Sequence, residues 1–287
     1  MATLIDNRYG KAKVRVLKVN KNKDFHSVLD LDCCVLLQGQ FEETYLTGNN
    51  EKVVATDSMK NTVYLLAQRE HFKSPEELGI ILGKHFLNTY SHVSHVHVTI
   101  RENVWERMKS TYEKKEHDHS FVRAREVHTA SVTSMRGRPP QVKSGIQDLL
   151  IMKTTGSGFE NFLRDKYTTL PETKDRVFAT AVTAEWTYNT TENVNYPNVY
   201  QEFKGAVFDI FSLQYSKSVQ ETLYIIGKTA IDRVKEIDEI NLSLPNKHAF
   251  GFDFNKLGTK NENTVFQPVE EPSGLIEGTV KRLNAKY

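Results

Sequence analysis

The order of predicted secondary structure repeats once along this chain, and this repeat constrains the fold more than any single motif. Up to Val132 the hydrophobic pattern predicts two strands, two helices and two strands, and the same order returns after Ser144. Between them, Arg136-Gly137-Arg138-Pro139-Pro140 interrupts all periodicity. We therefore expect domains at 1–137 and 138–287. No residue identity between the halves is apparent, so the repeat is one of architecture.

Alternating or continuous apolar residues predict the strands, and one-turn spacing predicts the helices. The first half has expected strands at 13–19, 28–41, 96–100 and 121–132, and helices from the Thr56 region to Arg69 and from Pro75 to Tyr90. The second half has expected strands at 144–154, 176–188, 240–244 and 275–282, and helices at 199–213 and 219–237. Each half should be an α+β layer, an antiparallel sheet with two helices over one face. Such a sheet can close with copies of itself into a barrel, which removes exposed edges.

Composition excludes several classes of protein. The 287 residues carry 38 basic and 36 acidic side chains, a net charge of +2 that provides no global field for nucleic acid. No apolar run is long enough for a membrane helix, and the start lacks a signal peptide. The ending Asn284-Ala285-Lys286-Tyr287 is not a Ser-Lys-Leu-type peroxisomal signal, which favours the cytoplasm.

The two cysteines, Cys33 and Cys34, are adjacent within an apolar run. Strand alternation would send them to opposite faces of a sheet. They predict neither a disulfide framework nor a cysteine-based metal site, and we interpret both as packing residues.

Val53 to Thr62 contains two polar residues, Thr56 and Asp57, where a strand-like approach passes into a helix. One interpretation is helix capping, in which a side chain satisfies an orphan amide. The other is that the free amides of this helix start bind an anionic ligand.

Four stretches of the second half carry candidate functional residues that also have a structural interpretation. The loop Thr154-Thr155-Gly156-Ser157-Gly158-Phe159 can simply turn the chain, or it can present Phe159 as a stacking platform for a planar ring. Arg176 can form a surface ion pair or clamp a planar anion. Gln220 follows a capping Ser218 and can be part of the capping box. His248 follows an expected Pro-Asn turn; it can be structural, or it can transfer protons, because histidine titrates near neutral pH.

Two His-x-His pairs, His95 with His97 and His117 with His119, place imidazoles on one face of a strand, an arrangement that a zinc site can use. Neither pair has a third ligand at short spacing, so we expect no metal.

Taken together, nine short stretches in order along nearly the whole chain resemble the urate oxidase (uricase) family. They are Tyr9-Gly10-Lys11, Thr56-Asp57 with Lys60-Asn61-Thr62, Ser91-His92-Val93, His117-Asp118-His119-Ser120-Phe121, Gly158-Phe159, Tyr167-Thr168-Thr169-Leu170, Asp175-Arg176, Ser218-Val219-Gln220 and Leu244-Pro245-Asn246-Lys247-His248.

The resemblance implies two tandem tunnel-fold domains per chain, with four chains closing stacked barrels. It implies oxidation of urate by O₂ to 5-hydroxyisourate and hydrogen peroxide with neither metal nor organic cofactor. It also implies active sites between subunits, one subunit supplying Lys11, Thr56 and Asp57 and its neighbour the remaining residues.

By the same resemblance each site residue has a role. Arg176, Gln220 and the Val219 backbone would hold the pyrimidine edge of urate, and Thr56 with the Asp57 amide the imidazole edge. Phe159 would stack beneath the ring, and Asn246 and Thr56 would bind oxygen above it. Lys11, Thr56 and His248 would relay protons.

Two alternatives stay open from the sequence. One is a zinc-dependent tunnel-fold enzyme of the pterin-synthase or cyclohydrolase type, for which the His-x-His pairs would matter. The other is a non-catalytic purine-binding oligomer, against which the set Lys11, Thr56 and His248 counts.

Overall fold

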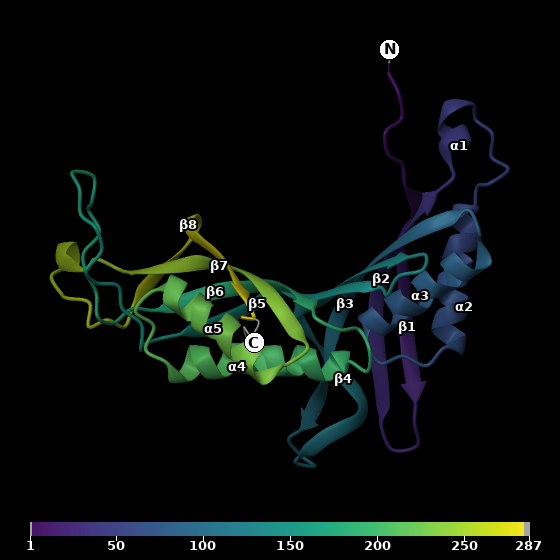
Figure 1. The fold of residues 1–287 in the computed structure, drawn as a ribbon. Coiled ribbons are helices and arrows are strands. Elements are labelled where there is room, and N and C mark those ends of the chain that lie inside the picture. Colours follow the sequence, from purple (N-terminus) through teal and green to yellow (C-terminus); the bar gives the residue numbers. More distant parts are fainter. Residues whose placement is uncertain (1, 284–287) are drawn as a thin grey trace. The chain divides into compact units, whose positions relative to one another are not determined.

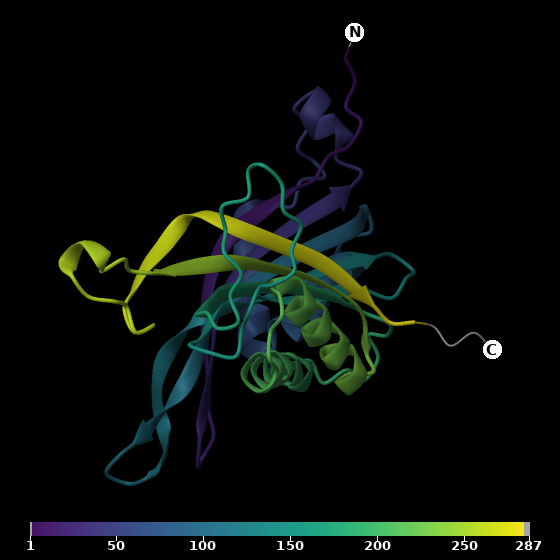
Figure 2. The same ribbon diagram turned by 90° about the vertical axis from the view of Figure 1, so that its left-hand side faces the viewer.

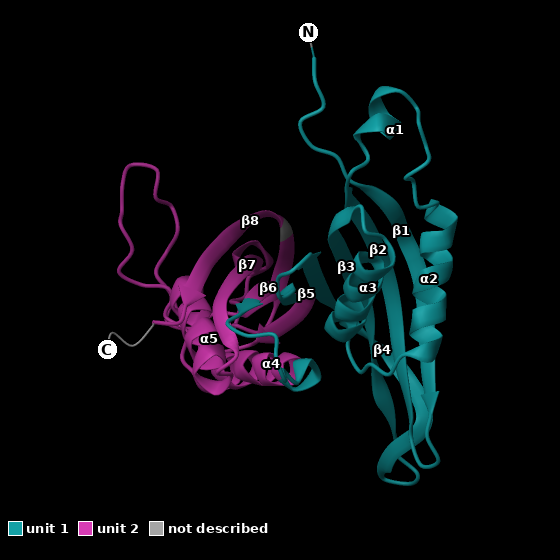
Figure 3. Ribbon diagram, turned by 45° about the vertical axis from the view of Figure 1, so that its right-hand side comes forward, with its two compact units in different colours: residues 1–145, 187–198 teal, residues 146–186, 199–287 magenta. Residues whose placement is uncertain are grey.

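The computed structural model describes residues 2–283 and divides them into two compact units. Unit 1 comprises residues 1–145 and 187–198, and unit 2 comprises 146–186 and 199–287 (Figure 3). The C-terminal tetrapeptide considered above, Asn284-Ala285-Lys286-Tyr287, lies outside the described residues. The predicted boundary between 137 and 138 falls in the turn between the fourth and fifth strands and stays a proposal.

Unit 1 contains a four-stranded antiparallel sheet in the order β1-β2-β3-β4. Helices α2 and α3 cover one face of this sheet (Figure 1). The elements are β1 (Tyr9–Lys21), β2 (His26–Gly39), α1 (Glu42–Leu46), α2 (Thr56–Arg69), α3 (Pro75–Thr89), β3 (Val93–Ser110) and β4 (Lys115–Met135).

The second half of the chain repeats this arrangement with strands in the order β5-β6-β7-β8, of which β7 and β8 run antiparallel. Most of it belongs to unit 2, but the start of β5, the end of β6 and the start of α4 belong to unit 1. Helices α4 and α5 lie on one side of β7 and β8 (Figure 2). The elements are β5 (Gln141–Lys153), β6 (Phe178–Tyr188), α4 (Tyr196–Leu213), α5 (Val219–Arg233), β7 (Ile237–Gly251), the short helix η1 (Asn255–Leu257) and β8 (Phe266–Lys281).

Alternate residues of the unit 1 strands build the core beneath the helices. Leu31, Cys33, Val35 and Leu37 on β2 are fully buried, whereas Cys34 is half-buried, so the two cysteines point to opposite faces as predicted. Burial raises the pKa of Cys33 to about 12, which keeps it a neutral thiol. Both cysteines are therefore packing residues.

Helices α3 and α5 begin with the same capping box. The Ser74 hydroxyl accepts a hydrogen bond from the Glu77 amide at 3.3 Å, and the Glu77 carboxylate accepts one from the Lys73 amide at 2.6 Å. In unit 2 the counterparts bond at 3.1 Å each, and they are Ser218, Glu221 and Lys217. The same local hydrogen bonds therefore fix the start of both helices.

Small residues let each of these helices approach its strand. A Cβ on Gly83 would lie 2.1 Å from Ser134 Oγ, and one on its counterpart Gly227 would lie 2.6 Å from Val280. One helical turn earlier, the glycine lies on the helix in α3 but on the strand opposite α5. Gly79 on α3 packs against Val132 on β4, whereas Leu223 on α5 packs against Gly278 on β8.

Aligned on their capping serines, α3 and α5 share Ser, Glu, Ile, Gly and Lys at five positions, of which the last is Lys84 in α3 and Lys228 in α5. The expectation that the halves share no residue identity was therefore wrong for this helix. Each half of the chain also has an arginine just after its last strand. Its side chain donates hydrogen bonds to backbone carbonyls at and after the end of this helix. Arg136 donates to the carbonyls of Leu87, Tyr90 and Val93, and Arg282 to those of Ile231, Val234 and Ile237.

Several sequence-based boundaries differ from the structure. Strands β3, β4, β7 and β8 are longer than predicted, because cross-strand hydrogen bonds continue past the apolar residues. The segment before Thr56 is not a strand, and α1 was not predicted. Helix α5 ends at Arg233, since the chain must turn to enter β7 at Ile237.

Candidate active site

In unit 1 the predicted site residues lie on β1 and at the start of α2. Lys11 is half-buried next to an irregularity of β1, where the pairing register shifts between Lys11 and Val14. Tyr9 holds β1 to the segment before α2, because its hydroxyl accepts a hydrogen bond from the Val54 amide at 2.7 Å and lies 3.2 Å from the Val54 carbonyl. This contact positions the helix start relative to Lys11.

The start of α2 differs from the capping interpretation. The N-cap is Ala55, with no side-chain capping bond, and Thr56 and Asp57 are the first two helical residues. The first backbone bond of the helix runs from the Met59 amide to the Ala55 carbonyl, so the amides of Thr56 and Asp57 have no acceptor within the helix. Amides of this kind bind anions, as the alternative interpretation requires.

The exposed Asp57 carboxylate is held by its own helix. A hydrogen bond and the charge of Lys60 lower the pKa of Asp57, and the Asn61 amide and the charge of Lys11 contribute. The Asp57 side chain is thus engaged with Lys60 and Asn61, whereas the Asp57 backbone amide has no acceptor within the helix.

In unit 2 the glycine-rich loop is fixed by backbone hydrogen bonds on both sides. The Phe159 amide donates to the Thr173 carbonyl at 2.7 Å, and the reverse bond measures 3.0 Å. The Gly158 amide donates to the carbonyl of buried Ser216, just before α5, at 2.9 Å. The loop therefore brings Phe159 and Arg176 to the segment that leads into α5.

Arg176 is half-buried and directed by Ser157. Its amide donates to the Ser157 carbonyl at 2.9 Å and its Nε to the Ser157 hydroxyl at 3.3 Å. The guanidinium carbon lies 5.5 Å from the Phe159 ring centroid and 5.9 Å from that of Phe178. Burial lowers the pKa of Arg176, although it stays a cation at neutral pH. The carboxylates that a surface pair would use are otherwise engaged, because Asp175 accepts a hydrogen bond from Thr155 and Glu172 pairs with Arg164.

Phe159 is half-buried and stacks on Phe162 with ring centroids 4.8 Å apart and planes 9° apart. The ring is therefore held in one orientation by an aromatic neighbour from the same loop. A fixed ring is a suitable platform for a planar ligand.

Val219 and Gln220 are the first residues of α5, after the capping Ser218. Val219 is buried and anchors the turn, whereas Gln220 is exposed. Glu221, not Gln220, completes the capping box, so the amide side chain of Gln220 is available for other contacts.

Asn246 and His248 lie within β7, not after a turn. The predicted Pro-Asn turn was wrong: the strand continues to Gly251, and the register with β8 shifts between Asn246 and His248. At this irregularity Asn246 Nδ2 and His248 Nδ1 lie 3.5 Å apart. The Gly274 amide donates to His248 Nε2 at 3.4 Å.

Two residues near the site were not predicted from the sequence. Ser157 directs Arg176, and its position inside the glycine-rich loop was a signal that could have identified it. Gly274 bonds to His248, and nothing local in the sequence marks it, because the pairing of β7 with β8 creates the contact.

The His-x-His pairs are engaged with neighbours. The rings of His95 and His97 are stacked 6.3 Å apart, and His97 lies within hydrogen-bond distance of Thr133 and Gln38. The rings of His117 and His119 lie 4.5 Å apart, edge to face. Within residues 2–283, no three His, Cys, Asp or Glu side chains are grouped as metal ligands would be.

None of the helices in the described part of the chain is both long and apolar enough to cross a membrane.

Comparison with known proteins connects both units of the chain to one family. The family model described as Uricase matches residues 7–133 and 142–277. A uricase of Dictyostelium discoideum is 64% identical over 288 residues, covering 100% of each chain. A uricase of Arthrobacter globiformis is 41% identical over 96% of this chain and 89% of its own. Its crystal structure aligns with a TM-score of 0.90, covering 100% of this chain and 97% of that one. The α+β tunnel fold expected from the sequence is confirmed, and the chain belongs to the uricase family.

Proposed function

We propose that this protein is a urate oxidase that converts urate, O₂ and water into 5-hydroxyisourate and hydrogen peroxide. The observation that carries the proposal is its full-length similarity to uricases, at 64% identity to that of Dictyostelium discoideum. The arrangement of Arg176 beside the Phe159 ring supports it, because a fixed cation and a fixed aromatic face together suit a planar anion.

In the proposed binding mode, the Arg176 guanidinium and the Gln220 amide hold the pyrimidine edge of urate, aided by the Val219 backbone. Phe159 stacks beneath the ring. The unpaired amide of Asp57, together with Thr56, meets the imidazole edge, where the positive end of the α2 dipole favours an anion.

Asn246 and Thr56 form the polar site above the ring for oxygen and then water. Lys11, Thr56 and His248 carry protons between urate and the reduced oxygen. The contact of His248 with Asn246 and Gly274 supports this role, since it orients the imidazole. Neither metal nor organic cofactor is part of the proposal. The remaining work of the protein is to orient urate and exclude bulk water.

The complete site is proposed to form between two chains of a homotetramer, with Lys11, Thr56 and Asp57 from one chain and the unit 2 residues from its neighbour. Light scattering coupled to gel filtration tests the tetramer. Dilution until it dissociates should abolish activity. The cytoplasmic location also stays a prediction, to be tested by cell fractionation.

The first experiment follows the ultraviolet absorbance of urate together with O₂ uptake and peroxide release, using metal-stripped protein. Loss of urate with matched O₂ uptake and peroxide release is the expected result. Turnover that returns only after zinc is restored would refute the cofactor-free mechanism and favour the zinc-dependent alternative. Urate binding without O₂ uptake would favour the non-catalytic oligomer.

A further inference from the structure

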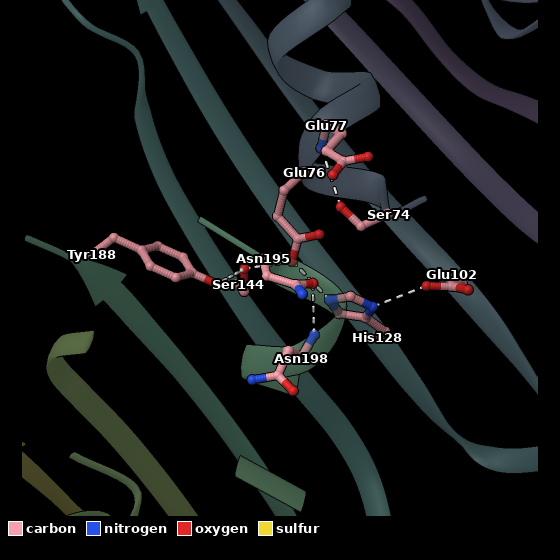
Figure 4. A network of polar contacts seen from close by, with 9 residues as sticks. All are labelled: Ser74, Glu76, Glu77, Glu102, His128, Ser144, Tyr188, Asn195 and Asn198. Carbon is pink, nitrogen blue, oxygen red and sulfur yellow. Dashed lines mark hydrogen bonds and ion pairs between the residues drawn. The ribbon is translucent and has the colours of Figure 1, made fainter. Parts of the chain in front are cut away.

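Unit 1 contains a buried row of three charged side chains that the proposed reaction does not use. His128 on β4 lies between Glu76 of α3 and Glu102 of β3 (Figure 4). Its Nε2 is 2.8 Å from Glu76 and its Nδ1 is 2.9 Å from Glu102. The side chains of Glu76 and His128 are 0% and 5% exposed.

This arrangement favours an imidazolium. Burial alone would lower the pKa of His128, but the charges and hydrogen bonds of Glu76 and Glu102 outweigh it and raise the pKa to about 10. Burial would likewise raise the pKa of Glu76, but His128 and the Ser144 hydrogen bond lower it. Both ring nitrogens of His128 therefore donate to carboxylates at neutral pH.

The strand registers show which unit 2 residues correspond to this row. Glu102 and His128 are cross-strand partners on β3 and β4, and Asn246 and Gly274 are cross-strand partners on β7 and β8. The same number of residues separates Ser74 from Glu102 as separates Ser218 from Asn246. Glu102 thus corresponds to Asn246, and His128 to Gly274.

The helix starts complete the correspondence. Glu76 is the second residue after the capping Ser74, and Gln220 is the second residue after the capping Ser218. The unit 1 counterparts of two proposed ligand contacts, Gln220 and Asn246, are therefore the two carboxylates that bind the His128 ring.

We propose that unit 1 retains a closed counterpart of the ligand site of unit 2, in which the His128 side chain itself occupies the place of a heterocyclic ligand. This rests on the ligand-binding roles proposed for Gln220 and Asn246. In unit 2 the corresponding Gly274 leaves the place open, since a Cβ added there would come no closer than 3.8 Å to any neighbour outside its own segment. With His128 removed, the unit 1 site would take an imidazolium-type cation.

Contacts independent of His128 would preserve the emptied site. The Ser144 hydroxyl donates to Glu76 and lies 2.7 Å from the Tyr188 hydroxyl (Figure 4). The capping box around Ser74 and Glu77 holds the backbone on which Glu76 is carried. The carboxylates would thus stay directed at the vacated space, where an added ligand restores their lost partner.

The test is the substitution His128→Gly, which copies Gly274 of unit 2. Calorimetry should detect one more imidazole bound per chain than in the wild-type protein, and imidazole should raise the melting temperature of the variant alone. Pyrazole is the matched control, because it has the same ring size but is neutral at pH 7. We expect it to bind at least about tenfold more weakly, since it lacks the charge-assisted hydrogen bonds. The double variant E76Q/H128G should lose this preference.

If His128→Gly fails to fold alone, refolding is the measurement. Imidazole, but not pyrazole or equal sodium chloride, should then restore the folded protein. No additional imidazole in a folded variant, or no recovery of an unfolded one, would overturn the proposal. Urate oxidation by the wild-type protein is assayed separately. Its absence would refute the proposed function, whereas the imidazole result would still show whether the unit 1 site exists.

Discussion

Units 1 and 2 use the same helix start for opposite purposes. In α3 the residue after the first helical position is Glu76, which is fully buried and paired with His128 and Ser144. In α5 the same position is Gln220, which is exposed beside the segment that fixes Arg176. The capping boxes and the strand registers are shared, so the backbone does not distinguish the two positions. The side chains between the helix and the strands distinguish them.

The difference also concerns charge. In unit 1 the position is filled by the buried His128 cation, which lies between the carboxylates of Glu76 and Glu102. Removing one of these partners leaves an uncompensated buried charge. Unit 2 has neutral amides at the corresponding positions, Gln220 and Asn246, which can bind a ligand without holding a permanent counter-ion. The following predictions test this division between a structural unit 1 position and a ligand-binding unit 2 position.

The largest effect is expected at Lys11, the unit 1 residue proposed to relay protons. Lys11→Met should reduce kcat by about 10²–10⁴-fold, because general acid–base catalysis contributes that much, while urate binding changes little. Thr56→Ala should act in the same direction. Steady-state kinetics measure kcat, and anaerobic urate titration measures the affinity for urate. Lys21→Met, on the exposed end of β1, is the control, and an equal loss there would refute the assignment.

Glu76→Gln makes unit 1 resemble unit 2 and should be strongly destabilising. It removes one carboxylate from a buried imidazolium, for which we expect a loss of about 3–5 kcal/mol in the free energy of unfolding. The reciprocal change Gln220→Glu lies on the surface and should alter this free energy by less than about 0.5 kcal/mol. Denaturant titration at fixed protein concentration compares them. Equal effects would contradict the division between the units.

The His128 row should also make stability depend on pH. Its folded pKa of about 10 lies above the ordinary value of 6.5, so its stabilisation is fully present below pH 6.5 and is lost as the pH rises through about 10. The difference in unfolding free energy between wild type and His128→Gln should therefore shrink by on the order of 5 kcal/mol over this range. A difference that stays constant with pH would show that His128 is not a buried cation.

Arg176→Ala tests the ligand-binding side of the comparison. The Michaelis constant for urate should rise by about 10²-fold, since charge-assisted contacts of this kind contribute about 1.5–3 kcal/mol. Arg176→Lys should recover part of the loss, because it keeps the charge without the planar fork. Arg164→Ala, on an exposed side chain, is the control. An unchanged Michaelis constant in Arg176→Ala would rule out the clamp.

The smallest effects are expected where the units are most alike. Arg282→Ala removes hydrogen bonds to three carbonyls at the end of α5 and should lower the free energy of unfolding by about 2 kcal/mol. Arg136→Ala removes the equivalent bonds from α3, but Arg136 is exposed and the loss should be nearer to about 1 kcal/mol. Thermal unfolding of the two variants compares the two losses of stability. A larger loss in Arg136→Ala than in Arg282→Ala would show that exposure does not determine how much each arginine stabilises the fold.

Much of the fold was predictable because its signals are local. The capping box at Ser74, the helix that follows it and the separation of Cys33 from Cys34 depend on residues within a turn or two of one another. The family resemblance also named the residues that the structure assembles in each unit, such as Arg176 with Phe159 and Asn246 with His248. Their proposed roles on urate await the kinetic tests.

The failures have a common physical cause. The Pro-Asn turn expected before His248 is a bulge inside β7, because pairing with β8 continues past Pro245. The cap expected at Thr56 or Asp57 lies at Ala55, because the Tyr9 contact with Val54 determines how the chain enters α2. In both cases a partner distant in sequence overrides the local preference.

The sequence by itself determined the two-fold repeat of strands and helices, the family and the set of residues to test. It determined these because hydrophobic period, capping residues and short motifs are local properties of the chain. Only the tertiary structure decided that Glu76, Glu102 and His128 form one buried row, since they come from three different elements joined by strand pairing and helix packing. Burial then determined that this row is a charged, closed position, while its counterpart in unit 2 has no side chain at Gly274 to fill it.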